Sequence, residues 1–308
     1  MNTNNNNNTA TTANNLPPST YTPNNNESRP KDKTISILIV SDIHLSFNNI
    51  KRLNKEMVDN NKNIDLIICS GDVCNFDPVD SEDLLKVSAC EGEMSNIYTY
   101  LHNIHKNIIY IPGNHDAKTT LLFPKGGSPP KLTTHSNNIH KNSYRLDDDL
   151  VLVGLGGSLP SIRNNENHWA GYPYQTEQEV ETDLTETFEA SKQQQTINSK
   201  SPLKTNDKIV LLTHMGPYNS STTIDQIECK DAEIYSGSKS INKFILENQS
   251  QIFLNIHGHT HHATGMARVG KTYVVNPGSV RSGHYVILTL EKYCGQLWRT
   301  KSTEFFKL

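Results

Sequence analysis

Acidic, amide and histidine side chains recur along this 308-residue chain in short groups that each follow a hydrophobic run. Their oxygen and nitrogen atoms are donors that suit Mn²⁺, Fe, Zn²⁺ or similar divalent ions. Two such ions held close together can generate a hydroxide near neutral pH and hydrolyse a phosphate ester. In chain order the groups are Asp42-Ile43-His44, Gly71-Asp72, Gly113-Asn114-His115-Asp116, His214 and Gly258-His259-Thr260-His261.

Two of the groups have an alternating pattern. In an extended chain, side chains two residues apart lie on the same side, so Asp42 and His44 are expected to reach one ion together. The same spacing relates His259 and His261. Each pattern alone also fits an ordinary strand end followed by a turn.

The groups that begin with Gly71 and Gly113 suggest a bridging ligand, an amide ligand and a catalytic ring. Glycine allows a tight turn before Asp72, whose two carboxylate oxygens make it a natural bridge between two ions. Asn114 offers a neutral amide oxygen, and His115 beside it offers a charged or proton-donating ring. We expect Asp116 to orient that ring or to adjust its basicity.

The remaining histidines carry less information. His214 ends a strand, where a lone histidine is more often structural than metal-binding. It becomes a candidate ligand only in combination with the other groups. His257 and His262 flank the last group, and we expect them to lie outside the set of direct ligands.

Hydrophobic periodicity places these groups at strand ends. The first half predicts strands at 35–40, 65–69 and 108–111, with helices at 49–61 and 93–106 between them. This alternation is typical of β-α-β units in a mostly parallel sheet, so the groups should meet at the carboxyl edge of that sheet.

The second half is mixed. We expect paired strands at 144–146 and 150–153, strands at 209–212 and 252–256, and helices at 177–194 and 239–248. Residues 158–175 and 195–207 are predicted to be a polar loop and a polar linker. Short strands within 267–298 are expected to form a second sheet that packs on the first.

Composition limits the classes of function. Residues 1–33 are mostly Asn, Thr, Ser and Pro and predict a disordered tail, which leaves 34–308 as a single domain. The tail lacks the pattern of a secretory signal, and no later segment is apolar enough to span a membrane. The net charge is −3, without a basic stripe, which makes nucleic acid an unlikely partner. Five cysteines without framework spacing favour reduced thiols in the cytoplasm, with Cys69 and Cys74 as buried fillers.

The whole set, in this order, resembles the calcineurin-like metallophosphoesterase superfamily over roughly residues 34–290. The resemblance implies an α/β fold, a four-layer α-β-β-α sandwich in which helices flank two mixed β-sheets. The segment Asn276-Pro277-Gly278-Ser279-Val280 resembles one found in the small phosphodiesterase-type branch.

The resemblance also implies roles for the residues. The first of two divalent metal ions would be bound by Asp42, His44 and His261. The second would be bound by Asn114, His214 and His259, with Asp72 bridging the two. His115 would stabilise the phosphoryl oxygens or protonate the leaving group, with Asp116 as its partner.

Departures from the family pattern narrow the branch. Protein phosphatases of this superfamily continue Gly-Asp with Asp-Arg-Gly and follow their Asn-His with Glu, whereas this chain has Val73-Cys74-Asn75 and Asp116. Purple acid phosphatases have a metal-binding Tyr where Asn75 stands. Both types are therefore disfavoured.

The resulting prediction is an enzyme, a hydrolase of phosphodiesters or phosphomonoesters that acts on small or nucleotide-like substrates through a metal-bridging hydroxide. Rim residues that could contact substrate are Arg163, His168, Trp169 and Arg281. Two alternatives stay open: a catalytically silent protein-interaction scaffold on the same fold, and a nuclease. The sequence leaves the oligomeric state and the identity of the metals open.

Overall fold

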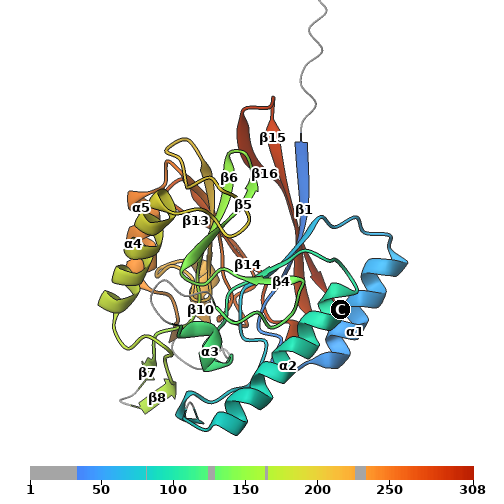
Figure 1. Ribbon diagram of the computed structural model, residues 1–308, viewed down its shortest axis with the longest axis vertical. Helices are drawn as coiled ribbons and strands as arrows, with labels where there is room; N and C mark the ends of the chain where they lie inside the picture. The colour runs from blue at the N-terminus through green and yellow to red at the C-terminus, as the bar shows by residue number, and fades with distance from the viewer. Residues whose placement is uncertain (1–32, 81, 124–128, 164–165, 226–233) are drawn as a thin grey trace, which may run out of the picture.

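The computed structural model describes residues 33–80, 82–123, 129–163, 166–225 and 234–308. In this part of the chain, two six-stranded sheets lie face to face and helices cover their outer faces (Figure 1). The predicted four-layer sandwich of two mixed sheets is therefore confirmed. The predicted tail lies outside the described residues except for Lys33, which begins the first strand.

The first sheet has the strand order β16-β15-β1-β2-β3-β4. The strands β1 to β4 are parallel neighbours, whereas β15 and β16 run antiparallel to the strands beside them. The bounds are β1 Lys33–Val40, β2 Leu66–Cys69, β3 Ile108–Tyr110, β4 Ser136–Asn138, β15 His284–Tyr293 and β16 Leu297–Lys307.

The second sheet has the order β13-β14-β12-β9-β6-β5. Its four central strands are parallel, and the antiparallel strands β13 and β5 form its edges. The bounds are β5 Asn142–Asp147, β6 Leu150–Leu155, β9 Lys208–Thr213, β12 Ile252–Ile256, β13 Gly265–Val269 and β14 Thr272–Asn276.

Helices α1 and α2 cover the first sheet, and α4 and α5 cover the second (Figure 1). Helix α4 begins with a capping box in which Thr176 and Glu179 satisfy each other's backbone amides. The bounds are α1 Phe47–Asp59, α2 Leu84–His102, α3 Lys118–Leu121, α4 Glu177–Gln193 and α5 Lys239–Glu247, with short 3₁₀ turns at Pro78–Asp80, Ser221–Thr223 and Val280–Ser282.

Alternation along the strands builds three hydrophobic layers. In β1, Leu38 and Val40 pack against α1 and α2, while Ile37 and Ile39 point into the space between the sheets. A third layer lies between the second sheet and the helices α4 and α5. Because both faces of the central strands are buried, these strands read as continuous apolar runs in the sequence.

Three parts of the fold differ from the sequence-based expectation. Helix α2 begins well before the predicted range 93–106, because Asp83 caps its first turn by accepting from the amides of Leu85 and Lys86. The predicted loop 158–175 contains the antiparallel pair of β7 (Ser161–Arg163) and β8 (Glu166–Trp169), and β10 (Ile224–Asp225) pairs antiparallel with β11 (Ile234–Tyr235).

The C-terminal strands are the third difference. Only β13 and β14 join the second sheet, whereas β15 and β16 extend the first sheet beside β1. This pairing joins residues more than 200 positions apart, such as Ile35 and Leu290, so no local pattern reveals it. Among the described helices, none combines the length and the apolar character needed to cross a membrane.

A buried ion pair fastens the β5–β6 hairpin to the chain before β9. The guanidinium of Arg145 lies 2.8 Å from an Asp207 carboxylate oxygen and also donates to the carbonyls of Asp148 and Pro202. The Arg145 side chain is 8% exposed and that of Asp207 0%. Its cation therefore compensates a carboxylate that water cannot reach.

Replacing Arg145 with Ala should lower the free energy of unfolding by about 3–5 kcal/mol, because the Asp207 charge stays buried without its partner. Urea denaturation measures this change. The exposed pair of Lys192 and Glu189 supplies the control, and Lys192→Ala should cost less than about 1 kcal/mol. Equal losses in both variants would contradict the interpretation.

Candidate metal centre

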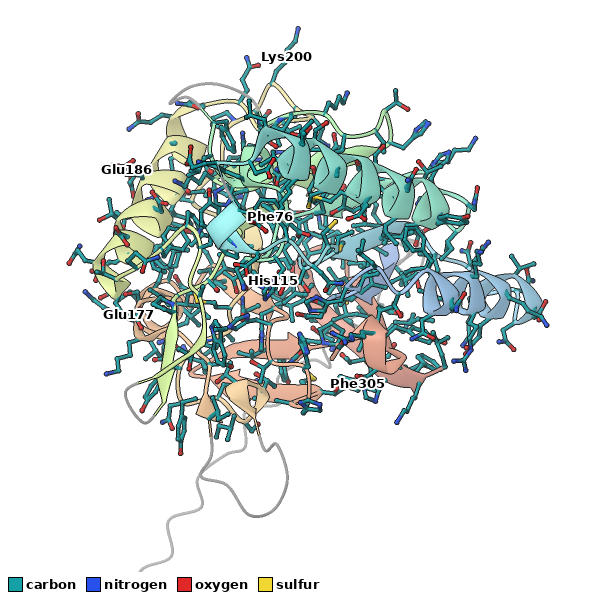
Figure 2. All side chains as sticks on the ribbon, turned by 90° about the horizontal axis from the view of Figure 1, so that it is seen from below. Phe76, His115, Glu177, Glu186, Lys200 and Phe305 are labelled. Carbon is teal, nitrogen blue, oxygen red and sulfur yellow. The ribbon has the colours of Figure 1, made fainter. Side chains whose placement is uncertain are left out.

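The predicted donor residues lie on loops that leave the carboxyl ends of five parallel strands. The loops after β1, β2 and β3 come from the first sheet, and those after β9 and β12 come from the second. Backbone hydrogen bonds join neighbouring loops within each set, since the Gly258 amide donates to the His214 carbonyl and the Asp42 amide donates to the Gly71 carbonyl. The two sets are joined where the His259 amide donates to the Asp42 carboxylate at 3.0 Å. Seen from below, His115 lies near the centre of this end of the sandwich, beside Phe76 (Figure 2).

The spacing of the motifs predicts an extended backbone at the site. The structure differs, because the backbone there is curled. Asp42, His44, Asp72 and His259 have φ angles of 50°, 47°, 52° and 65°. Left-handed conformations are uncommon for residues other than glycine and cost of order 1–3 kcal/mol each when strained. The loops thus curl their side chains inward, and the alternation of an extended chain plays no part.

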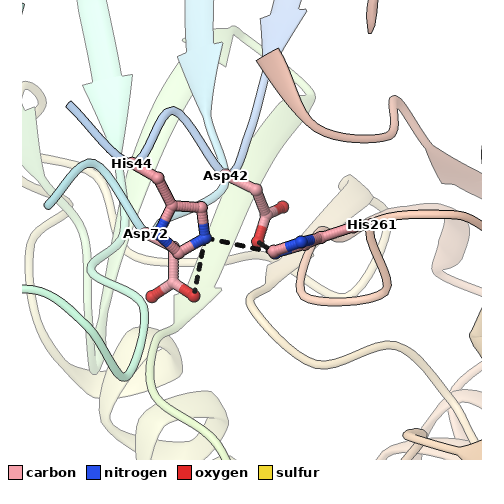
Figure 3. Close-up of side chains that lie close together, drawn as sticks. All are labelled: Asp42, His44, Asp72 and His261. Atoms are coloured by element: carbon pink, nitrogen blue, oxygen red, sulfur yellow. Dashed lines mark hydrogen bonds and ion pairs between the residues drawn. The ribbon is translucent and has the colours of Figure 1, made fainter. Parts of the chain in front are cut away.

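Two groups of donor atoms result, and they share Asp72. One group contains Asp42, His44, Asp72 and His261 (Figure 3), and the other contains Asp72, His214 and His259. Within each group the donor atoms all lie within 4.8 Å of one another. The amide oxygen of Asn114 lies 3.2 Å from His214 Nε2, which brings it to the second group.

In the first group, the imidazole nitrogens face one another and the carboxylates. His44 Nε2 lies 3.1 Å from His261 Nε2 and 3.9 Å from Asp72 Oδ2. His261 Nε2 lies 3.1 Å from Asp42 Oδ1. These separations leave room for a cation between the four side chains.

Hydrogen bonds to the far side of two rings fix which nitrogen faces inward. His44 Nδ1 lies 2.8 Å from Asn75 Oδ1 and 3.1 Å from the Cys74 carbonyl, so Nδ1 carries a proton and donates it. His214 Nδ1 likewise donates to the Ser70 carbonyl at 2.7 Å. In the neutral form of each ring, the lone pair on Nε2 is therefore directed at the shared aspartate.

The second group contains an unsatisfied buried atom. His259 Nε2 is shielded from solvent and has no hydrogen-bond partner among the described residues. Burial and the neighbouring His214 lower the pKa of His259 to about 3, which keeps the ring neutral. Imidazole nitrogens, the shared Asp72 carboxylate and an amide oxygen form a donor set that fits a hard or borderline divalent cation.

Even without an ion, charged side chains of each donor group shift the pKa values of side chains in the other group. Burial raises the pKa of Asp42, but the imidazoles of His261 and His214 outweigh it and lower that pKa to about 2. Burial lowers the pKa of His214, yet the carboxylates of Asp72 and Asp42 raise it to about 9. Protons on the imidazoles thus balance the buried carboxylates, and a metal ion would displace those protons from the same lone pairs.

Asp116 differs from the expectation. We expected it to be the partner of the His115 ring, but His115 Nδ1 is bonded to the Phe76 carbonyl at 3.0 Å. The Asp116 carboxylate instead accepts from the backbone amides of Val73, Cys74 and Gly113 at 2.8 to 2.9 Å. Asp116 therefore holds together the two loops that carry Asp72 and His115.

Sequence reasoning missed the groups that orient the ligands. Asn75 was noted only for replacing the tyrosine of purple acid phosphatases, yet its side chain orients His44. The other acceptors, at Ser70, Cys74 and Phe76, are backbone carbonyls, which no residue type reveals. Cys69 and Cys74 are buried thiols, as expected of fillers, and Cys90 is buried as well.

The segment Asn276-Pro277-Gly278-Ser279-Val280 acts as a clamp between loops. Ser279 Oγ donates to the Asp42 carbonyl at 2.7 Å, and Asn276 Nδ2 donates to the Thr260 carbonyl at 2.8 Å. Arg281 follows directly, and its backbone amide also donates to Asp42. The segment thus fixes the loop of Asp42 relative to the loop of His259 and His261.

Of the predicted rim residues, Trp169 contacts the ring of a candidate donor. Its ring meets His259 edge-on at 5.0 Å between centroids, and its Nε1 donates to the Leu159 carbonyl. The side chains of Arg163 and His168 fall outside the described part of the chain.

The sequence profile of the calcineurin-like phosphoesterase family matches residues 35–263. The chain belongs to this family. The predicted resemblance is thereby confirmed. Phosphoester hydrolysis is the activity of the family, and its members typically bind divalent metals. An uncharacterized protein of Methanocaldococcus jannaschii is 26% identical over 245 residues, which are 80% of this chain and 88% of that protein.

Solved structures share the fold. The crystal structure of TT1561 of Thermus thermophilus is 17% identical, with a TM-score of 0.51 over 88% of this chain and 99% of that one. Another crystal structure reaches a TM-score of 0.59 at 16% identity, over 88% of this chain and 99% of the other.

The close approach of Gly113 to Asp72 gives a test of the site. A Cβ at position 113 would clash with the backbone nitrogen and Oδ1 of Asp72. Gly113→Ala should therefore displace Asp72 and lower the amount of bound metal. It should also lower the free energy of unfolding by about 1–3 kcal/mol. Metal analysis and urea denaturation measure both effects.

Gly92 in α2 is the matched control, because a Cβ there would meet nothing within 4 Å. Gly92→Ala should keep the full metal content and gain about 0.5–1 kcal/mol. Normal metal content in Gly113→Ala would show that the position of Asp72 does not govern the site.

Proposed function

We propose that this protein is a hydrolase of small phosphoesters that depends on two divalent metal ions, with nucleotide-like esters as its substrate class. The observation that carries the proposal is the pair of donor groups that meet in the Asp72 carboxylate. Asp42, His44 and His261 would hold one ion, and Asn114, His214 and His259 the other. When bound, the ions would neutralise phosphoryl oxygens and make water more acidic.

His115 is the proposed catalytic residue. Its Nδ1 is engaged by the Phe76 carbonyl, so Nε2 is the ring nitrogen that can face a substrate. Its backbone amide donates to Asp72 Oδ1 at 2.8 Å, which keeps the ring beside the donor groups. In its protonated form, Nε2 would hydrogen-bond to a phosphoryl oxygen or deliver its proton to the departing alkoxide.

The substrate's organic part would lie against Trp169. A pocket of about 290 Å³ borders this side chain and Tyr235 at the end of β11. A pocket of this volume can hold the organic part of a small ester, whereas a protein substrate would dock on a broader surface. The preference for a small substrate, the single domain 34–308 and a cytoplasmic location remain predictions. A scaffold function is disfavoured because no predicted donor is missing from the chain.

Metal analysis of the purified full chain, combined with a panel of phosphoesters, tests the substrate class. We expect about two ions per chain and turnover of aryl phosphate esters, with cyclic nucleotides among the diesters. Purified protein without divalent ions and without turnover after addition of Mn²⁺ would contradict the proposal. Retention on nucleic acid that weakens steeply with salt would favour the nuclease alternative.

Two substitutions separate metal binding from chemistry. Asp72→Ala should abolish both metal uptake and turnover, because it removes the donor common to both groups. His115→Ala should keep the metal and lower kcat by about 10²- to 10⁴-fold, as expected for loss of a general acid.

The control is His135→Ala, which removes an exposed imidazole that stacks on His102 far from the donors. It should leave both readouts unchanged. Unaltered turnover of an aryl phosphate ester by either site variant would contradict the assignment.

A further inference from the structure

A second cleft opens at the opposite end of the sandwich from the metal centre. Lys208 begins β9 and His214 follows its end, so at about 3.3 Å per residue the two regions lie roughly 20 Å apart. The cleft has a volume of about 510 Å³ and lies between the two sheets. It is bordered by the starts of β9, β12 and β14 on one side and by the β15–β16 hairpin on the other.

The described lining of the cleft is cationic, although the chain as a whole has a net charge of −3. Its charged side chains are Lys208, Lys271, Arg299, Lys301 and one carboxylate, Glu291. Arg299 and Lys301 already neutralise Glu291, at 2.6 and 3.4 Å. The lysines at 208 and 271 face no carboxylate within ion-pair distance in the described part of the chain.

The ammonium groups of these two lysines differ in their hydrogen bonding. Lys208 Nζ donates to the Ser250 carbonyl at 2.7 Å, which fixes the ammonium at the cleft. The ammonium of Lys271 has no hydrogen bond or ion pair with any described residue. Both therefore retain donors for an anion that carries several acceptor oxygens.

Both sheets depart from regular pairing at this cleft. In β12, Ile252 and Leu254 pair with consecutive residues of β9, so Phe253 is an extra residue. In β16, Thr300 and Ser302 pair with consecutive residues of β15, so Lys301 is an extra residue. Such bulges re-aim side chains and often lie beside binding sites.

The lining also offers groups for a neutral, planar part of a ligand. Phe253 and Tyr273 are partly buried on neighbouring strands and border the cleft. Thr300 Oγ1 is shielded from solvent, borders the cleft and has no hydrogen-bond partner among the described residues. A buried hydroxyl without a partner is costly unless a ligand or water satisfies it.

We propose that this cleft binds an organic phosphate of about mononucleotide size. Its phosphate would lie between Lys208 and Lys271, and its ring would lie against Phe253 and Tyr273. The volume lies within the range of about 300–1,000 Å³ that small-molecule sites have. This site is separate from the metal centre and does not depend on the proposed hydrolase activity.

Isothermal titration of the full chain with AMP and with inorganic phosphate tests the proposal. The protein is first stripped of metal with a chelator and dialysed, at low ionic strength, so that the metal centre cannot retain the phosphate through its ions. We expect saturable AMP binding that is tighter than phosphate binding. In Lys208→Gln/Lys271→Gln, AMP affinity should fall about tenfold or more, since two charged donors are lost.

The control is Lys192→Gln/Lys243→Gln, which makes the same charge change on the exposed faces of α4 and α5. It should bind AMP within about twofold of the wild type, because neither lysine borders the cleft and each is already held in a surface ion pair with a glutamate of α4. Thr300→Val, which keeps charge and shape, should also weaken AMP binding. Absence of saturable binding, equal binding of AMP and phosphate, or equal effects of the two double variants would overturn the proposal.

Discussion

The buried carboxylate of Asp72 is the constraint on which the site depends. A negative charge removed from water is costly unless positive charge or hydrogen-bond donors surround it. Here one oxygen accepts the His115 amide and the other faces His214 at 3.2 Å and His44 at 3.9 Å. Burial raises the pKa of Asp72, yet the imidazoles of His214, His115 and His44 hold it well below its usual value. The loops of both sheets must therefore converge on this group.

Hydrogen bonds between the loops maintain the convergence. Asp116 ties the loops after β2 and β3, Ser279 ties the chain after β14 to the loop of Asp42, and Gly258 ties the loop after β12 to His214. The left-handed residues at the site have a conformational cost, which persists only when surrounding structure over-determines it. Three fully packed layers beneath the loops provide that rigidity.

The sequence predicted the central strands, and the carboxylates and histidines that it singled out lie together in the structure, because both depend on local signals. Apolar runs such as Ile37 to Val40 mark strands buried on both faces, and the donors follow such runs directly. It could not predict that β15 would join the first sheet, since that pairing depends on contacts with a strand more than 200 residues away. The partner of His115 was also missed, because a backbone carbonyl leaves no trace in residue type. The inward curl of Asp42 and Asp72 was likewise invisible, since aspartate also favours ordinary turns.

The same rigidity limits how the two ends of the sandwich can influence each other. Coupling between distant sites requires an element with two arrangements whose equilibrium both sites bias. The strands that run from the lysine-lined cleft to the metal centre, β9 and β12, are buried almost throughout and hydrogen-bonded on both sides. Such strands offer no second packing of similar energy. A ligand in the cleft would contact the β15–β16 hairpin and the second sheet at once, so its binding energy would add to the cohesion of the two sheets. We therefore expect occupancy there to raise the stability of the whole fold by mass action and to leave the metal centre unchanged.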